Sequence, residues 1–464
     1  MLPTSALRQT SAKGPQSARS GCDRVSSSRL FARGLPPATD QHSAGKGRIL
    51  EGLHVVTLLS VLPCTVLWWP VYSSATFGNL TLLDCVLLAL WITTLALFFS
   101  SHTRFPSLVR RCASVCAFAV LIGCCSAVST VVFGRTAYLV DDLLRFMKVF
   151  GLPSIIPLSI CLMPRYPIHR LLTVSALLAT TFNIGVQFTD YQDKLPLFSH
   201  FSGLSAGQSF RPTGAISNPN DYAYISIAGL AFAMAWWTYA RRSSVLSRLL
   251  CFGAIAATSF AIVTSGSRSA MAGLLCGAIY YMSKRGFSVA AKIGLATALV
   301  FIVVAGWQLS EVFRERMDAA ITQRSQEMNV VSRAEAQAIS LKTWIEWPLG
   351  VGFSNMPEAT TPNANGATWV TAVQGSDSIY VNFLLGAGIQ GFAFLLLCFA
   401  GCWKLATMAP LGPRTGVFRS AILCLMFCGF ATIAPATIFV APFFFTLVGF
   451  AALPERRDKV SRNR

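Results

Sequence analysis

Charged residues are scarce in this 464-residue sequence: they make up 12% of it, whereas 53% of the residues are hydrophobic. A soluble domain carries about 25% charged residues. The deficit excludes an ordinary soluble enzyme and a predominantly disordered chain. Acidic residues are the scarcest, with 19 Asp and Glu against 38 Lys and Arg. At so low a charge density, the basic excess indicates the anionic leaflet of a membrane as the partner, and no nucleic acid.

Two further features are missing. The 14 cysteines do not show zinc-ligand spacing beside histidine, and most lie in apolar runs, so we interpret them as small packing residues. Residues 1–50 have no apolar core of the kind found in a secretory signal peptide. We interpret this basic segment as a disordered cytoplasmic arm. An organelle transit peptide and a start codon placed too early are the alternatives.

Long apolar runs follow from Val55 onward, most of them long enough to cross about 30 Å of hydrocarbon. The final run, Ser420 to Leu453, is too long for one span at about 1.5 Å per residue, and Pro435 and Pro442 allow a break within it. We therefore read two spans there. The other predicted spans cover residues 55–72, 80–99, 112–133, 149–163, 171–188, 222–240, 249–267, 269–283, 286–309 and 379–403. The sequence predicts an all-α polytopic integral membrane protein with about 12 transmembrane helices.

The loop charges give these spans an orientation. If residues 1–50 are cytoplasmic, 27 of the 38 basic residues fall in the arm, the cytoplasmic loops and the C-terminal tail. The positive-inside rule then predicts both termini in the cytoplasm. The predicted parts are the arm 1–50, helices 1–5 in 51–188, helices 6–9 with their preceding outer loop in 189–309, a large outer loop 310–378, helices 10–12 in 379–453, and the basic tail 454–464.

The outer loop 310–378 is expected to be partly helical. Ser332-Arg-Ala-Glu335 matches a capping box, which predicts a helix from there to Trp347, and Pro348 ends it.

Gly386-Ala-Gly388-Ile-Gln-Gly391 fits a dinucleotide-binding pattern, but it lies in the middle of an apolar run. Close helix packing by small residues is the better interpretation of that motif, as it is for Gly273 and Gly277.

Polar chemistry gathers at the predicted outer boundary, because the span interiors contain almost no ionisable groups. Asp84 and Lys292 each lie near a span end. Three arginines, Arg211, Arg268 and Arg333, are candidates to converge on one outward-facing cavity. Guanidinium groups match the geometry of phosphate, and their charge stabilises a departing diphosphate. The alternative role for Arg268 is snorkelling or capping of backbone carbonyls.

These residues resemble the O-antigen ligase and O-antigen polymerase family of bacterial polysaccharide assembly. The resemblance covers roughly residues 205–395. It rests on five motifs in order: Arg211-Pro-Thr-Gly214 with Asn218-Pro-Asn220, Ser265-Gly-Ser267-Arg268, Arg333, Trp347-Pro-Leu-Gly-Val-Gly352, and Ser376-Asp-Ser-Ile-Tyr380 with Gly388-Ile-Gln-Gly391.

The resemblance implies a metal-independent, inverting glycosyltransferase at the periplasmic face of the bacterial inner membrane. The donor is a glycan on undecaprenyl diphosphate, and the acceptor is a growing glycan or lipid A-core. Arg211 and Arg268 would hold the diphosphate, with Arg333 assisting, and Asn220 and Tyr380 are candidate substrate-binding residues. The resemblance implies no cofactor. A chain-length regulator is a candidate partner, beside the lipid bilayer.

The catalytic base is the point of departure from the family. Ligases of the family have a His-Asn pair where this chain has Asp377-Ser378, and this absence favours a polymerase or a divergent transferase over a lipid A-core ligase. Asp377 is a candidate replacement for the base, although it also suits a helix cap. Asp141-Asp142 is an alternative site for a divalent cation, like the acidic pairs of other lipid-sugar transferases, but it lacks a D-x-D motif and we assign no metal ligand. A transporter or flippase for lipid-linked glycans is the alternative from another functional class.

Overall fold

The computed structural model describes residues 44–67, 70–74, 78–100, 107–134, 136–163, 168–186, 214–216, 218–240, 244–284, 288–309, 314, 318, 328–353, 359–362, 368–371, 378–432 and 434–453. The chain divides into two units, Met1–Gly47 and Arg48–Arg464, and the architecture below is that of the second.

The described residues of the second unit are almost all helical, which confirms the all-α prediction. The α-helices are α1 (Ala44–Leu67), α2 (Leu82–Ser100), α3 (Ser107–Val132), α4 (Leu139–Phe146), α5 (Ile156–Leu162), α6 (Ile168–Val186), α7 (Pro219–Ala240), α8 (Val245–Thr264), α9 (Arg268–Ser283), α10 (Val289–Leu309), α12 (Met328–Glu346), α13 (Ile379–Ala406), α14 (Pro413–Cys428) and α15 (Ala441–Ala452). Single turns η2 (Thr136–Tyr138), η3 (Met147–Gly151), η4 (Pro153–Ile155) and η6 (Gly214–Ile216) complete the helical structure.

Strands within the described ranges form two short antiparallel hairpins. Strand β1 (Pro70–Ser74) pairs with β2 (Gly78–Thr81), with Ser74 opposite Gly78. Strand β3 (Ala359–Pro362) pairs with β4 (Thr368–Thr371), with Pro362 opposite Thr368. Both hairpins lie in connections between helices and contribute nothing to a shared sheet.

Six helical segments in the described part of the chain are long and apolar enough to cross a membrane. They are Ile49–Leu67, Leu82–Ser100, Ser107–Val132, Thr136–Leu162, Val245–Thr264 and Ile379–Ala406. Large apolar side chains stay exposed on helices such as α8 and α10, as expected for helices that face lipid. The count of about 12 spans and the periplasmic position of the 310–378 loop remain predictions.

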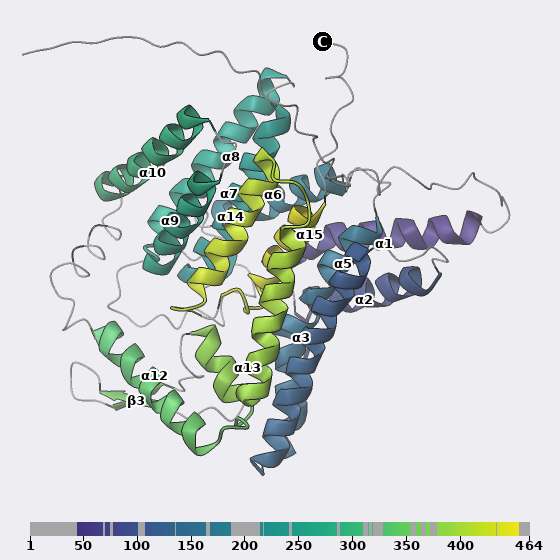
Figure 1. Ribbon diagram of the computed structural model, residues 1–464, viewed down its shortest axis with the longest axis vertical. Helices are drawn as coiled ribbons and strands as arrows, with labels where there is room; N and C mark the ends of the chain where they lie inside the picture. The colour runs from purple at the N-terminus through teal and green to yellow at the C-terminus, as the bar shows by residue number, and fades with distance from the viewer. Residues whose placement is uncertain are drawn as a thin grey trace, which may run out of the picture. The chain divides into compact units, whose positions relative to one another are not determined.

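Helices far apart in the sequence pack side by side. Figure 1 shows α13 running along α3, and α14 lying beside α9. Gly273 and Gly277 of α9 make the second contact close, because a Cβ at Gly277 would lie 2.8 Å from the Ser420 carbonyl oxygen of α14. The prediction of small-residue packing at these two glycines is therefore confirmed.

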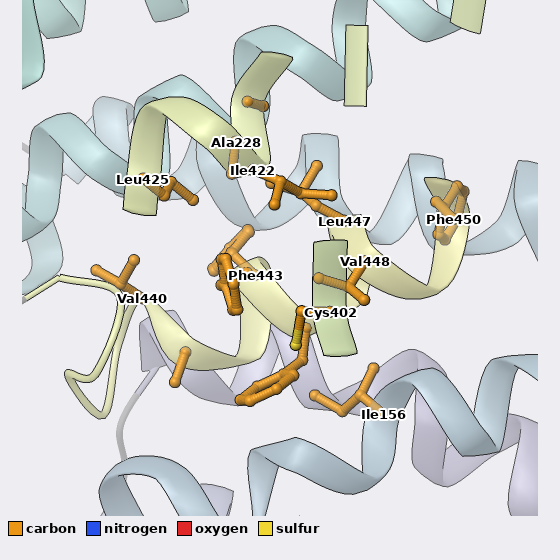
Figure 2. Close-up of a cluster of buried hydrophobic side chains, with 14 of the residues drawn as sticks. Ile156, Ala228, Cys402, Ile422, Leu425, Val440, Phe443, Leu447, Val448 and Phe450 are labelled. Atoms are coloured by element: carbon orange, nitrogen blue, oxygen red, sulfur yellow. The ribbon is translucent and has the colours of Figure 1, made fainter. Parts of the chain in front are cut away.

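Helix α15 forms the centre of the apolar core. All twelve of its residues are buried, which is the pattern of a helix that is apolar on every side and surrounded by protein. Figure 2 shows Phe443, Leu447 and Val448 packed against side chains of α5, α13 and α14. The break predicted within residues 420–453 is present, since α14 ends at Cys428 and α15 begins at Ala441.

The predicted span 379–403 lies within the candidate membrane segment Ile379–Ala406, and its helix is interrupted at Gly388. There the backbone has φ 68° and ψ −174°, and the ribbon of α13 changes direction (Figure 1). The loop after α12 docks on this break. The Val351 amide donates to the Leu385 carbonyl over 2.8 Å, and the Gly352 amide donates to the Gly386 carbonyl over 3.0 Å. The glycines of the dinucleotide-like pattern thus let the backbone of the loop pack directly against the backbone of α13.

The predicted start of the loop helix is wrong. Helix α12 begins at Met328, so Ser332 lies within its second turn and does not cap it. The apolar residues that precede Ser332 extend the helix by one turn. The predicted end is right within one residue, because α12 stops at Glu346 before Pro348.

Candidate functional site

The first helix of the candidate site is α7, whose start is determined by the Asn218-Pro-Asn220 motif. Asn218 caps the helix, since its side-chain oxygen accepts from the Asn220 amide over 2.9 Å. Pro219 is the first helical residue, where its missing N–H costs nothing. Just upstream, Gly214 has φ +58° and lies against Asn183 of α6, whose side-chain oxygen accepts from the Ala215 amide over 2.8 Å.

The second helix is α9, which follows α8 after a three-residue turn. Gly266 has φ +60°, a conformation that favours glycine, and this lets the chain reverse between Thr264 and Arg268. The Ser267 amide donates to the Ser265 hydroxyl over 3.2 Å. Arg268 is the first residue of α9 and is half-buried. The very tight turn predicted from the sequence is therefore present.

The third helix is α13, and its start is held by the segment 429–440 between α14 and α15. The Ile379 amide donates to the carbonyls of Gly429 and Thr432, both over 3.0 Å. The Ser378 hydroxyl donates to the same Gly429 carbonyl over 3.3 Å. In addition, the Tyr380 hydroxyl donates to the Met426 carbonyl over 3.1 Å. We call the starts of α7, α9 and α13, together with residues 429–440, the helix-start site.

A chain of buried hydroxyls joins three of these parts, and its direction follows from one proton per hydroxyl. Thr432 donates to the Cys428 carbonyl over 2.9 Å, because a carbonyl only accepts. Tyr224, which is fully buried, donates to Thr432 over 2.9 Å. Ser269 therefore donates to Tyr224 over 2.6 Å, and Ser267 donates to Ser269 over 3.2 Å. The chain links α9, α7 and the 429–440 segment without a charged group.

The electrostatics of the helix-start site favour an anion. The first turn of an α-helix leaves backbone N–H groups without intrahelical partners, and the helix dipole places partial positive charge there. The hydrogen bonds above bring the starts of α7, α9 and α13 into one cluster. Arg268 adds a full positive charge at the start of α9. Phosphate groups suit such an arrangement of N–H donors and guanidinium.

Asp221 is the acidic residue of this cluster within the described ranges. It lies in the first turn of α7, one residue before the predicted span 222–240, and is only 5% exposed. Its carboxylate accepts a hydrogen bond from the Thr437 hydroxyl. Burial raises the pKa of the Asp221 carboxyl from 3.8 to about 7, and the hydrogen bond from Thr437 opposes part of that rise.

The predicted site residues divide into two groups. Arg268, Asn220 and Tyr380 all lie in or beside the helix-start site. Arg333 is in α12, but its side chain is outside the described part, as are the whole of Arg211 and Asp377. For those three residues, convergence on the site remains a prediction.

The remaining acidic candidates are engaged elsewhere. Asp84, in the first turn of α2, forms an ion pair with Lys148 of η3 over 3.4 Å and accepts from the Thr81 amide and hydroxyl. Asp142 is fully buried and accepts from the Thr130 hydroxyl of α3. Among the described residues, no three His, Cys, Asp or Glu side chains are grouped to hold a metal ion.

Sequence reasoning missed the contribution of residues 429–440. Their contacts with α13 run mainly through backbone carbonyls, which leave no trace in residue type. Thr432 and Thr437 carried no motif either, because isolated threonines are common in apolar helices. The one available signal was a tyrosine in a strongly apolar stretch, Tyr224, since a buried phenol needs a hydrogen-bond partner.

The comparison with protein families bears directly on this site. Residues 252–396 match the family model described as O-antigen ligase. We call this matched segment the O-antigen ligase domain. The resemblance inferred from the motifs is thereby confirmed over that segment. No curated protein matches the chain.

The O-antigen ligase domain begins within α8 and ends within α13, beyond the break at Gly388. It contains Arg268, Arg333 and Tyr380, as well as the docked loop and the break at Gly388. The start of α7 and residues 429–440 lie outside the matched segment, although they complete the helix-start site. The matched domain and the apolar helices together indicate a multi-pass bacterial membrane protein with a glycosyltransferase-like function of the ligase and polymerase type.

Proposed function

We propose that the chain is a polymerase that extends a glycan carried on undecaprenyl diphosphate, at the periplasmic face of the inner membrane. The observation that carries the proposal is the helix-start site within and beside the O-antigen ligase domain. Three helix starts and Arg268 meet there, and this charge pattern suits a diphosphate. The substrate identity, the periplasmic face and cytoplasmic termini are parts of the proposal.

The proposed reaction is a direct displacement at the anomeric carbon of the donor sugar. A hydroxyl of the acceptor glycan attacks that carbon, and the bond to the diphosphate oxygen breaks with its electron pair. Negative charge grows on the diphosphate, and Arg268 and the helix starts stabilise it. Because attack comes from the opposite side, the anomeric configuration inverts. We propose that guanidinium groups supply the charge that a metal ion supplies in other transferases.

Two further arginines are proposed to share this role. Arg211 precedes Gly214 by three residues, and Gly214 is held against Asn183 of α6. Arg333 belongs to α12, whose far end is docked on α13 by the loop 348–352. Asn220 and Tyr380 are proposed to contact the glycan. Asp377 is the base proposed from the sequence, and it directly precedes Ser378 of the site.

A growing glycan is the proposed acceptor. The chain has Asp377-Ser378 where ligases of the family have His-Asn, and this departure argues against transfer to lipid A-core. A polymerase needs the same diphosphate site as a ligase, but it takes a second lipid-linked glycan as the partner. We therefore expect the acceptor to arrive from the membrane too.

The test is the replacement of Arg268 by alanine in cells that depend on this chain for polymer. We expect high-molecular-weight polysaccharide to disappear while the protein level in the membrane stays the same. Arg248→Ala is the matched control, because Arg248 is exposed in the first turn of the same helix hairpin, at the opposite end of α8. Polymer of normal length in the Arg268→Ala strain would refute the proposal.

A transporter of lipid-linked glycans is the second candidate, and one observation favours it. Helix α13 is broken at Gly388, and α14 and α15 are separated by a non-helical segment. Interrupted helices that meet inside a bundle are typical of transporter binding sites. Movement of the lipid-linked glycan between leaflets without chain growth would support this alternative.

A further inference from the structure

Glycosyl transfer to a hydroxyl requires a group that accepts the hydroxyl proton. Carboxylates and imidazoles are the usual acceptors, and they must reach the proton directly or through one water. Within the described part of the helix-start site, the only carboxylate is Asp221, and histidine is absent there. Asp221 of α7 is therefore the candidate base in the described part of this site.

The position of Asp221 relates it to the proposed diphosphate site. Asp221 and Tyr224 are three residues apart in α7, so they share one face of the helix. The Tyr224 hydroxyl contacts Ser269, which directly follows Arg268. Asp221 thus lies one helical turn from Tyr224, whose hydroxyl belongs to the chain of hydroxyls that ends beside the arginine. Its hydrogen bond to Thr437 orients the carboxylate across the gap between α7 and residues 429–440.

The surroundings of Asp221 supply little positive charge to hold it ionised. Burial is the main influence on this carboxyl and raises its pKa to about 7, and the Thr437 hydroxyl is the opposing influence. Of the described parts of the helices packed on α7, α9 carries Arg268 as its first residue and α14 carries Cys428 as its last, beside Tyr224 of α7 itself. The adjoining ends of α6, η6, α8 and α15 carry no titratable side chain.

A carboxylate that carried a permanent charge here would repel a diphosphate. A carboxyl that exchanges its proton near neutral pH avoids this conflict, because it is neutral for part of the time and still basic enough to accept a proton. A surface carboxyl would remain fully ionised and be a weaker base. The buried position of Asp221 therefore matches what a base beside a diphosphate site requires.

We infer that Asp221 is the general base of the transfer, in place of Asp377, an inference that rests on the proposed function. The acceptor hydroxyl gives its proton to a carboxylate oxygen of Asp221 as its own oxygen forms the new bond to the anomeric carbon. The bond from that carbon to the diphosphate breaks, and the electron pair leaves with the diphosphate oxygen. Asp221 then releases the proton to water.

The experiment measures the initial rate of glycan growth against pH, with the purified full chain in liposomes and lipid-linked repeat units as substrate. For the wild-type chain, we expect the rate to rise about tenfold per pH unit below about pH 7 and to level off above it. We expect Asp221→Asn to lower the plateau by about 10²- to 10⁴-fold and to abolish this acidic limb. Asp221→Glu should restore part of the rate together with the limb.

A second variant separates a base from a merely structural carboxyl. Thr437→Val removes the hydrogen bond that favours the ionised form of Asp221, so the acidic limb of the pH profile should move to higher pH. Glu346→Gln is the matched control, because this carboxylate is exposed at the end of α12. A limb that stays in place in Thr437→Val would overturn the inference.

The failure of the inference is distinguishable from failure of the proposed function. If the acidic limb disappears in Asp377→Asn and persists in Asp221→Asn, Asp377 is the base and the inference is overturned, while the transferase stands. If Arg268→Ala keeps full glycan growth, the proposed function itself fails. Circular dichroism and elution as a single species establish that each variant is folded before its rate is compared.

Discussion

Replacement of Gly388 by alanine tests how the O-antigen ligase domain holds its loop helix. Gly388 has φ 68° and ψ −174°, a region of backbone space that is essentially restricted to glycine. A residue with a Cβ is strained there by about 1–3 kcal/mol. The added Cβ would also collide with the carbonyl group of Leu349, so the docked loop 348–352 must move away from α13.

That displacement breaks specific hydrogen bonds. The Leu349 carbonyl accepts from the Ser129 hydroxyl over 2.5 Å and from the Gln390 side-chain amide over 3.1 Å. Each of these bonds contributes a net stability of about 0.5–1.5 kcal/mol. Together with the backbone strain, the loss amounts to about 2–6 kcal/mol of unfolding free energy. Because α12 is attached to this loop, Arg333 should also lose its position, and glycan growth should fall.

The assay is thermal unfolding of the purified chain in detergent, with glycan growth measured on the same preparation. Gly253→Ala is the matched control, because a Cβ added at Gly253 in α8 would meet no atom within 4 Å and the residue has no positive φ. The control should be unchanged or slightly stabilised, since alanine favours a helix by up to about 1 kcal/mol over glycine. If Gly388→Ala unfolds at the same temperature as the control, the docking contributes nothing and the reasoning is refuted.

Three further predictions concern buried polar groups. Tyr224→Phe should lower the unfolding free energy by about 1–3 kcal/mol, because Thr432 and Ser269 lose the hydroxyl that both of them contact. A double-mutant cycle with Thr432→Val should show a coupling energy above about 0.5 kcal/mol. Arg419→Leu should cost about 2–4 kcal/mol in urea unfolding, because the guanidinium donates to the Ala406 carbonyl at the end of α13 over 2.8 Å and to the Ala409 carbonyl beyond it over 2.5 Å. A change below about 0.5 kcal/mol would contradict this. Asp221→Asn should stabilise the fold above about pH 7. Because the pKa of Asp221 is raised in the folded chain, the wild type should lose about 4 kcal/mol of stability as the pH rises from about 4 to about 7, and the variant should not. Equal stability of variant and wild type at both ends of that range would contradict this prediction.

The sequence was a good guide to features that leave a signal in residue type. Apolar runs predicted where the helices lie, and Gly266 among serines predicted the tight turn before Arg268. The prolines near 435 and 442 indicated the break between α14 and α15. Each of these signals is a direct physical constraint on the local backbone, so it needs no knowledge of distant contacts.

Other features depend on contacts that residue types do not encode. The break at Gly388 exists because the loop 348–352 supplies backbone partners there, and an apolar run conceals it. Helix α15 is buried on every side, so its sequence resembles that of a lipid-facing span. Residues 429–440 enter the candidate site mainly through carbonyls, and Asp221 directly follows the Asn218-Pro-Asn220 motif without a signal of its own.

The most direct test of the central claim is a reconstitution with two readouts. The purified chain is placed in liposomes with lipid-linked repeat units that carry a fluorescent label, and both glycan length and the leaflet of the label are followed. The account predicts longer glycans on the lipid carrier, no change of leaflet, and loss of growth in Arg268→Ala. Movement between leaflets without any longer glycan would contradict it.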